Sequence, residues 1–416
     1  MKRSLEWLYP GLGIKRWVLL AFAGAALMVA SAIFTVGVLW SPDLLKGLGM
    51  GWLHGRHYAA ALLAIDGIML GALMAYVGAR RAWLFQKTSP ETVAEIREAG
   101  RLARGTRVVA VGGGNGLAAL LRGLKTHTSN LTAVVTMADD GGSSGALRRD
   151  MGMPPPGDLR NCLVALADDE SMMSRLFQYR FPDGGGLQGH SFGNLFMAAL
   201  AEVTGDFELA VQESTHVLKV RGRVLPSTLA DIVLHAQLEG GGQVSGESTI
   251  TAAERLPRHV WITPAAPRAL PQALSALRRA DVVVLGPGSL YTSIIPNLLI
   301  PEVRDAIKET RAWVLYVCNV MTQAGETDGY TAADHLDALH RHGLEGLVDV
   351  VLVNDTLVSP DLIASYARSG ARPVVSDDSR LRAMGVKVVH ASVAAESNVV
   401  RHDSTRLAQS ILHIVR

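Results

Sequence analysis

Two long apolar stretches near the start of the chain interrupt an otherwise mixed pattern of hydrophobic and polar residues. Residues 17–40 contain no charged side chain, and residues 58–79 contain only Asp66. A helix of about 20 apolar residues crosses the hydrocarbon core of a bilayer. A signal peptide has a shorter apolar run, and a helix of a soluble core is rarely uncharged over such a length. We therefore predict a membrane hairpin over residues 1–87.

Basic residues stand outside both stretches. They are Lys2, Arg3, Lys15 and Arg16 before the first stretch, and Arg80, Arg81 and Lys87 after the second. The connecting loop holds only Lys46 and Arg56. The positive-inside rule then predicts a multi-pass protein of the cell membrane, with both termini and the large domain in the cytoplasm. Tryptophans near the ends of the stretches are typical of an aromatic belt: Trp7, Trp17, Trp40, Trp52 and Trp83.

Asp66 is unusual in such a stretch. A carboxylate within a span costs about 2.5–3.5 kcal/mol and tends to face protein. Ser31 and Thr35 are expected at a comparable depth on the other helix. We expect Asp66 to hold the two helices together, or to be protonated, rather than to form a transport site.

Strand and helix periodicities alternate beyond a polar linker. Residues 88–105 read as a juxtamembrane helix, with Ser89 as its N-cap and Pro90 at its first position. Residues 106–111 form a short apolar run, and leucines at 117, 120, 121 and 124 then recur at helical spacing. Residues 131–137 repeat the strand. This order predicts a doubly wound, Rossmann-like α/β domain with a mostly parallel sheet over residues 106–416.

Helical spacing dominates residues 160–218, which we expect to form an α-rich insert. Strands over 231–238 and 243–250 are expected to pair as a hairpin around three glycines. Alternation of strands and helices then returns. The later predicted elements are strands at 282–285, 313–317, 348–353, 373–375 and 386–390, and a closing helix at 404–415.

Glycine-rich loops follow the first two predicted strands. They hold Gly112, Gly113, Gly114, Asn115 and Gly116, and then Asp139, Asp140, Gly141, Gly142, Ser143 and Ser144. Glycines at a strand–helix junction let backbone N–H groups approach a phosphate, so the loops predict a nucleotide or nucleotide-sugar site. Leu117 stands where a dinucleotide fingerprint has its third glycine, and no Walker Gly-Lys-Ser/Thr follows. An NAD site remains one alternative, because Asp139 lies near the position where an acidic residue would bind the ribose of NAD. A second alternative is that the glycines only form tight turns.

Polar side chains in these loops admit more than one role. Asp139 and Asp140 suit a divalent cation, ribose hydroxyls or a loop cap. Ser143 and Ser144 suit either an anion or the N-cap of the following helix. A second polar group follows after Asp158, an expected N-cap: Arg160, Asn161, His190 and Asn194.

Arg160 offers a planar fork to a phosphate, and a structural salt bridge is its alternative. His190 and Asn194 are four residues apart, so we expect them on one face of a helix. His190 fits a proton donor, a ligand contact or a core histidine. The opposite wall of the site is expected from Gly286, Gly288, Ser289, Tyr291, Asn319 and Thr322. Tyr291 breaks a Gly-x-Ser-x-Gly elbow, so no serine triad is predicted.

Composition narrows the classes of partner. The formal net charge is +2, and no basic run is interleaved with aromatics, so no nucleic-acid partner is expected. Hydrophobic residues make up 49% of the chain and the mean hydropathy is +0.22, which fits a membrane segment beside a large core. Cys162 and Cys318 lack metal-ligand spacing and are expected in that core.

The ordered motifs resemble one family. They are Gly-Gly-Gly-x-Gly-Leu from Gly112, Asp-Asp-Gly-Gly-Ser-Ser-Gly from Asp139, Pro-Pro-Gly-Asp-x-Arg-Asn from Pro155, Gly-His-Ser-Phe-Gly-Asn-Leu from Gly189, Gly-Pro-Gly-Ser-Leu-Tyr-Thr-Ser from Gly286 and Asn-Val-Met-Thr-Gln-Ala-Gly-Glu-Thr from Asn319. From Arg107 to the C-terminus the chain is similar to the YvcK-type gluconeogenesis factors of the CofD-like superfamily. It departs from them at Asn115, where threonine is expected, and in the N-terminal region, which soluble members lack.

This resemblance implies a regulatory protein that binds a UDP-sugar such as UDP-N-acetylglucosamine and is needed for cell shape and envelope synthesis on gluconeogenic carbon. The alternative that it implies is a magnesium-dependent transferase, which moves a phosphate-linked group from a nucleotide diphosphate donor to an alcohol. Asp140 and His190 would then be the catalytic candidates, and Asp140 the metal ligand. The base and sugar of the ligand, turnover and association into a homo-oligomer stay open.

Overall fold

The chain is described by a computed structural model over residues 14–40, 57–86, 97–167, 172–253, 255–396 and 400–415. It divides into two compact units, Met1–Arg101 and Leu102–Arg416. Of the predicted linker helix, residues 97–102 are helical, whereas Ser89 and Pro90 lie outside the described residues. The tryptophans at positions 7 and 52 lie outside them as well.

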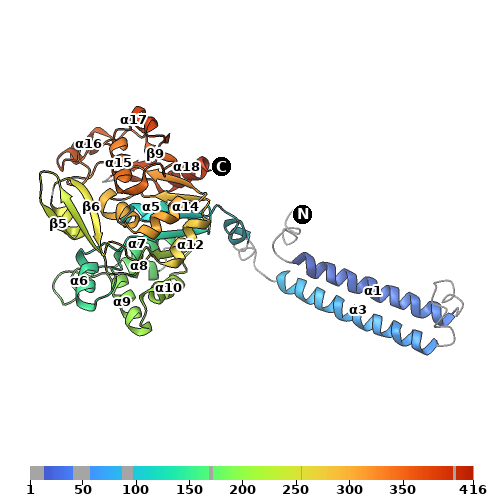
Figure 1. The fold of residues 1–416 in the computed structure, drawn as a ribbon. Coiled ribbons are helices and arrows are strands. Elements are labelled where there is room, and N and C mark those ends of the chain that lie inside the picture. The colour runs from blue at the N-terminus through green and yellow to red at the C-terminus, as the bar shows by residue number, and fades with distance from the viewer. Residues whose placement is uncertain are drawn as a thin grey trace. The chain divides into compact units, whose positions relative to one another are not determined.

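The first unit pairs two long helices, α1 (Ile14–Trp40) and α3 (His57–Gln86), side by side and antiparallel (Figure 1). Glycines form the contact: a Cβ on Gly71 would lie 2.7 Å from the Gly24 carbonyl oxygen, and one on Gly78 would lie 2.6 Å from the Ala21 nitrogen. Lys15–Val36 and Leu62–Trp83 are both long and apolar enough to cross a membrane. The two predicted helices are therefore present, and α3 extends seven residues past the predicted end at residue 79.

Asp66 does not hold this pair together. Its side chain is exposed, and the neighbouring Gly67 is the residue that α1 approaches, against Ser31. The reason is steric, since the missing side chain of Gly67 leaves room for Ser31 of α1 on that side of α3. Thr35 Oγ1 donates within its own helix to the Ser31 carbonyl, at 2.8 Å. The expectation that Asp66 joins α1 to α3 is wrong.

The second unit is built on a parallel sheet of seven strands in the order β10-β9-β8-β7-β1-β2-β3. The strands are β1 (Val108–Gly112), β2 (Leu131–Val135), β3 (Arg223–Pro226), β7 (Val282–Leu285), β8 (Trp313–Val317), β9 (Val350–Asn354) and β10 (Lys387–Ala391). The chain thus builds outward from β1 in one direction and from β7 in the other. The predicted Rossmann-like sheet is confirmed, with its topological switch point between β1 and β7.

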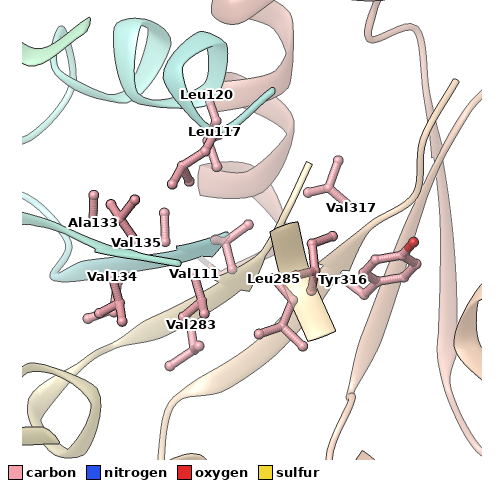
Figure 2. Close-up of a cluster of buried hydrophobic side chains, with 14 of the residues drawn as sticks. Val111, Leu117, Leu120, Ala133, Val134, Val135, Val283, Leu285, Tyr316 and Val317 are labelled. Atoms are coloured by element: carbon pink, nitrogen blue, oxygen red, sulfur yellow. The ribbon is translucent and has the colours of Figure 1, made fainter. Parts of the chain in front are cut away.

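The central strands are buried along their whole length, as expected of a parallel sheet covered on both faces. Figure 2 shows Leu117 and Leu120 of α5 (Gly114–Leu124) on one face, near Ala133 and Val135, while Val134 and Val283 point to the other. Both faces are thus closed by apolar packing, and the strand ends are left for the loops.

Helices fill the segment between β2 and β3, which confirms the α-rich insert. They are α6 (Gly142–Met151), α7 (Gly157–Leu166), α8 (Met172–Gln178), α9 (Phe192–Thr204) and α10 (Phe207–Val217). The helical segments after residue 270 are α12 (Pro271–Arg279), a π-helical turn η3 (Leu290–Ile294), α13 (Ile295–Leu298), α14 (Pro301–Glu309), α15 (Ala332–Leu339), a second π-helical turn η4 (His340–Leu344), α16 (Pro360–Ala367), α17 (Asp378–Ala383) and α18 (Ser404–Ile414).

Two predicted strands differ in the structure. A small antiparallel sheet contains β4 (Val233–Leu238), β5 (Gln243–Ser245) and β6 (Pro257–Thr263). The strand expected over 243–250 ends at Ser245, because Gly246 turns at φ 97° and α11 (Glu247–Ala252) begins. Residues 373–375 make one isolated bridge, between Pro373 and Met321, because proline lacks the N–H that a ladder needs. A late hairpin instead joins β11 (Ala394–Glu396) to β12 (Val400–His402).

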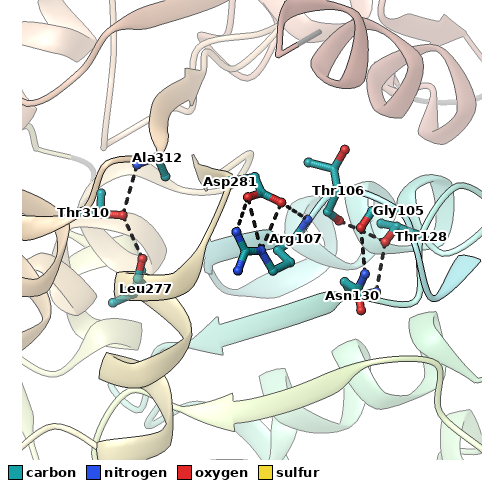
Figure 3. Close-up of polar contacts among 9 residues, drawn as sticks. All are labelled: Gly105, Thr106, Arg107, Thr128, Asn130, Leu277, Asp281, Thr310 and Ala312. Atoms are coloured by element: carbon teal, nitrogen blue, oxygen red, sulfur yellow. Dashed lines mark hydrogen bonds and ion pairs between the residues drawn. The ribbon is translucent and has the colours of Figure 1, made fainter.

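Polar contacts fix the ends of the strands opposite the glycine loops (Figure 3). The carboxylate of Asp281, just before β7, accepts from the backbone N–H of Arg107 at 2.8 Å and from its guanidinium at 2.5 Å. These hydrogen bonds hold the pKa of Asp281 below its usual value. Asn130 and Thr128 similarly bind the turn before β1, through the carbonyls of Gly105 and Thr106. The first contact keeps β1 beside β7 and the second keeps it beside β2, so together they align the loops at the other end.

Candidate functional site

A cleft of about 670 Å³ lies at the carboxyl ends of β1, β7 and β8. Three loops form its walls: residues 113–116 after β1, 287–289 after β7 and 319–324 after β8. After β1 the chain continues to β2 on one side of the switch point, and after β7 it continues to β8 on the other side, which opens a crevice between the two loops. The cleft therefore occupies the place where ligands bind in open α/β sheets.

The first loop needs its glycines for two different reasons. Gly114 has φ +65°, a left-handed conformation that disfavours other residues, and its missing side chain faces open space 3.9 Å from Ser293 Oγ. Gly116 lies against the next loop, since a Cβ there would be 2.6 Å from the Pro287 carbonyl oxygen. Gly112 is under neither constraint and lies behind the cleft wall. The loop thus presents the backbone of Gly114 to the cleft without a side chain, and Asn115 lines the cleft beside it.

Three carboxylates line one side of the cleft: Asp139, Asp158 and Glu247. Burial, and then the charge of Asp139, raises the pKa of Asp158 to about 6. Burial and the neighbouring Asp139 and Asp140 raise the pKa of Glu247 to about 7. The prediction of Asp158 as an N-cap is wrong, because Pro156 precedes the first turn of α7 and Asp158 lies within that turn. Its carboxylate instead receives a hydrogen bond from the backbone of Gly114.

Asp140 points away from this cleft. Its Oδ1 accepts from the backbone N–H of Ser248 in the first turn of α11, at 2.8 Å. Asp139 also accepts from within its own loop, from Gly141 N at 3.0 Å, but it remains on the cleft wall. Across the described ranges, no three His, Cys, Asp or Glu side chains are grouped so as to hold a metal ion. The metal and catalytic roles of Asp140 stay predictions.

Ser143 and Ser144 join separate elements and do not cap α6. Ser144 Oγ accepts from Gly157 N of α7 at 3.1 Å. Ser143 Oγ accepts from Asn194 Nδ2 at 3.1 Å and lies 3.1 Å from His190 Nδ1. His190 and Asn194 do not share a helical face as expected, because α9 begins only at Phe192, with Ser191 as its N-cap. They meet through Ser143 instead.

Ser143, Ser144, Arg160, Asn161 and Asn194 line a smaller polar cavity of about 250 Å³ next to the cleft, with Gly141 and Gly142. Asp139 and Asp158 belong to the walls of both. The structure therefore brings most of the predicted residues into two adjoining cavities rather than one.

The opposite wall contains part of its predicted set. Gly288, Ser289, Asn319 and Thr322 line the cleft, and Ser289 Oγ donates to Gln323 Oε1 at 2.8 Å. Tyr291 lies behind that wall, fully buried, with its hydroxyl 2.9 Å from that of Tyr330. Burial and this neighbour raise the pKa of Tyr291 above its usual value. Gly286 also lies behind the wall, and Thr292 lines the cleft where Tyr291 was expected.

Sequence reasoning missed the contribution of the C-terminal part. Tyr366, at the end of α16, and Arg401 and His402, from β12, complete the cleft. Tyr366 OH accepts from Val400 N at 3.0 Å, which ties the two elements together. Burial lowers the pKa of His402 to about 4. No motif marks these residues, since they are isolated in the sequence and reach the site only through the fold.

Comparisons with known proteins agree with this architecture. Residues 108–394 match the family described as 2-phospho-L-lactate transferase CofD. The gluconeogenesis factor of Bacillus subtilis is 47% identical over 311 residues, which cover 74% of this chain and 98% of that protein. A relative from Nostoc sp. is 44% identical over 417 residues, 98% of this chain and 91% of its own length. A crystal structure from Bacillus halodurans matches with a TM-score of 0.72 and 48% identity, over 74% of this chain and 100% of that one.

Proposed function

Because the chain belongs to the CofD family, and within it to the gluconeogenesis factors, we propose that its cleft binds a UDP-sugar such as UDP-N-acetylglucosamine and that occupancy regulates envelope synthesis and cell shape. The observation that carries this proposal is the convergence of the β1 and β7 loops on one cleft at the switch point. Nucleotide ligands of open α/β sheets bind at such a point.

The diphosphate belongs, on this proposal, at the loop that begins α5. The backbone there approaches the cleft without a side chain at Gly114, and the helix N-terminus favours an anion. A volume of about 670 Å³ is in the range for a ligand of nucleotide-sugar size. Arg401 and Tyr366 supply a cationic and an aromatic side chain at the far wall, where a base or sugar has polar and flat partners.

We also propose that α1 and α3 anchor this domain to the cytoplasmic face of the cell membrane. Their length and apolar composition support the anchor, and the basic residues Lys15, Arg16, Arg80 and Arg81 beside them support the orientation.

Calorimetric titration of the full chain in detergent tests the ligand. We expect UDP-N-acetylglucosamine to bind at least about tenfold more tightly than GDP or NAD, a difference of roughly 1.4 kcal/mol. Tighter binding of NAD would assign the cleft to a dinucleotide, and tighter binding of GDP would favour the donor of a transferase. Either result would overturn the UDP-sugar proposal.

A second candidate is the magnesium-dependent transferase, which the family description and the acidic wall favour. Asp139 and Asp158 would hold the metal in this case, because carboxylate oxygens suit Mg²⁺ and Asp140 faces α11. Mg²⁺ would neutralise charge on the transferred phosphoryl group. Turnover of a nucleotide diphosphate donor that needs Mg²⁺ and is abolished by Asp139→Asn would establish this function in place of regulation.

A further inference from the structure

A polar region beside the cleft has the chemistry of a separate anion site. Two adjoining cavities, of about 250 and 270 Å³, share Arg160, Asn161 and Arg180 on their walls. Arg122 of α5 lines the second cavity as well. We call the two together the arginine pocket. Its walls carry three guanidinium groups together with Asp139 and Asp158, which it shares with the cleft, whereas Glu247 lines the cleft alone.

Arg160 is the most constrained of these side chains. It is only 6% exposed, and its Nε is buried with no hydrogen-bond partner among the residues that the structure describes. One terminal nitrogen donates to Asn161 Oδ1 at 2.8 Å, and no ion pair to it is found in the described part of the chain. A buried guanidinium normally forms several charge-assisted hydrogen bonds, so Arg160 still has N–H donors that can bind an anion.

Arg180 adds a like charge at the same place. It donates to the carbonyl of Gly189 at 3.1 Å and is exposed to the pocket. Burial, and then the charge of Arg180, lowers the pKa of Arg160 to about 10, while the charges of Asp158 and Asp139 act in the opposite direction. Two guanidinium groups that repel each other across a polar cavity are stabilised when an anion lies between them.

The backbone that lines the arginine pocket also favours an anion. The first turns of α6 and α7, each of 10 residues, line the pocket with residues 141–144 and 157–158. Among the described residues, no side chain caps α6, so the first N–H groups of α6 face the cavity with no side-chain acceptor. Helix N-termini favour an anion through these groups and through the helix dipole.

We propose that the arginine pocket is a phosphate-binding subsite, in which Arg160, Arg180 and the first turn of α6 hold a phosphate or phosphomonoester group. This proposal is independent of the base and sugar that the cleft accepts. Its phosphate has two conceivable sources, a second phosphorylated ligand or a phosphate of the ligand in the cleft, because Asp139 and Asp158 lie on the walls of both cavities.

Titration of the full chain with inorganic phosphate, in a buffer without other multivalent anions, tests the subsite. We expect one phosphate per chain, with the dissociation constant raised at least about tenfold by Arg180→Gln or Arg160→Gln, as for the loss of a charge-assisted contact. Arg175→Gln on α8 is the matched control, since Arg175 is exposed and lies outside the pocket lining. Arg180 is itself exposed, so its replacement spares the fold.

A wild-type chain that binds no phosphate at millimolar concentration would overturn the proposal, as would equal weakening by all three substitutions. A repeat with saturating UDP-N-acetylglucosamine identifies the source. Unchanged phosphate affinity assigns the subsite to a second ligand, whereas competition together with weaker UDP-N-acetylglucosamine binding in Arg180→Gln assigns it to the cleft ligand. Failure of the subsite leaves the affinity of the cleft for UDP-N-acetylglucosamine intact, so the two proposals fail separately.

Discussion

Two glycines with the same backbone angle allow strain and ligand binding to be separated. Gly114 and Gly152 both have φ +65°, but Gly114 faces the cleft while Gly152 ends α6 in open space. Alanine at either position costs about 1–2 kcal/mol through the left-handed conformation. We expect Gly114→Ala alone to weaken UDP-N-acetylglucosamine binding, because its Cβ blocks the approach of the diphosphate.

Thermal unfolding and calorimetry on both variants check this expectation. Gly152→Ala supplies the control, with the same loss of stability and unchanged affinity. Equal affinity in the two variants would remove the diphosphate from this loop.

Glu326 gives a pH dependence with a defined sign. It is 1% exposed, its Oε1 accepts from Tyr291 N at 2.7 Å and Thr292 N at 3.1 Å, and within the described ranges its Oε2 has no partner. Burial raises its pKa from 4.5 to about 7. A raised carboxyl pKa contributes stability that is present below the unfolded pKa and is lost as the pH rises through the folded pKa. This contribution is therefore lost between pH 4.5 and about 7.

Glu326→Gln keeps the acceptor and removes the charge. We expect the variant to be more stable than the wild type at a pH of about 8, by up to about 3 kcal/mol, and the difference to shrink at a pH of about 5. The midpoints of thermal unfolding of the full-length wild type and variant, taken at both pH values, measure this difference in stability. The raised pKa values of Asp158 and Glu247 are present in both the wild type and the variant, so their effects cancel in the difference in stability. A variant that is less stable at both values would show that the carboxylate is ionised in the fold.

At the scale of elements, the contact between α1 and α3 depends on the absence of side chains. A Cβ on Gly71 would lie within 2.9 Å of Gly24 and Met28 atoms, whereas Ala72 points away from α1 and is exposed. Overpacking of this kind costs about 1–3 kcal/mol. We expect Gly71→Leu to separate the helices at a lower concentration of SDS, and Ala72→Leu to leave the pair unchanged.

Fluorescence transfer between labels at Lys15→Cys and Arg80→Cys follows the separation. Both positions are exposed at neighbouring ends of the pair, and the natural thiols Cys162 and Cys318 are buried. Equal effects of the two leucines would mean that bulk at any position disturbs the pair.

The orientation of the hairpin is the second prediction at this scale. The basic flanks predict that both ends of the hairpin lie in the cytoplasm and that the connecting segment, residues 41–57, lies outside. Reporter fusions at Gln86 and within residues 41–57 should give opposite signals. A cytoplasmic signal from the connecting segment would contradict the proposed anchor.

At the scale of the whole molecule, a regulator needs only occupancy of the cleft, whereas an enzyme also needs a group that acts in the transition state. His190 lies outside the cleft lining and contacts Ser143. We therefore expect His190→Gln to keep UDP-N-acetylglucosamine affinity within a few fold and to support growth of its native host on gluconeogenic carbon. Normal affinity without growth would instead indicate chemistry or signalling through His190.

The sequence alone determined what depends on local pattern. Apolar runs, helical leucine spacing and glycine-rich junctions specified α1, α3, the parallel strands around β1 and the loops that carry Gly114 and Ser289. These features follow from periodicity and backbone sterics, which act within a few residues.

Only the tertiary structure decided which side chains meet. It turned Asp140 toward α11, buried Tyr291 behind the wall, placed Asp158 in the cleft and brought Arg401 there from β12. It also set Asp66 on the exposed side of α3 and Arg180 beside Arg160. The physical reason is that side-chain direction and burial are set by packing between segments far apart in the chain, and no local pattern encodes that packing.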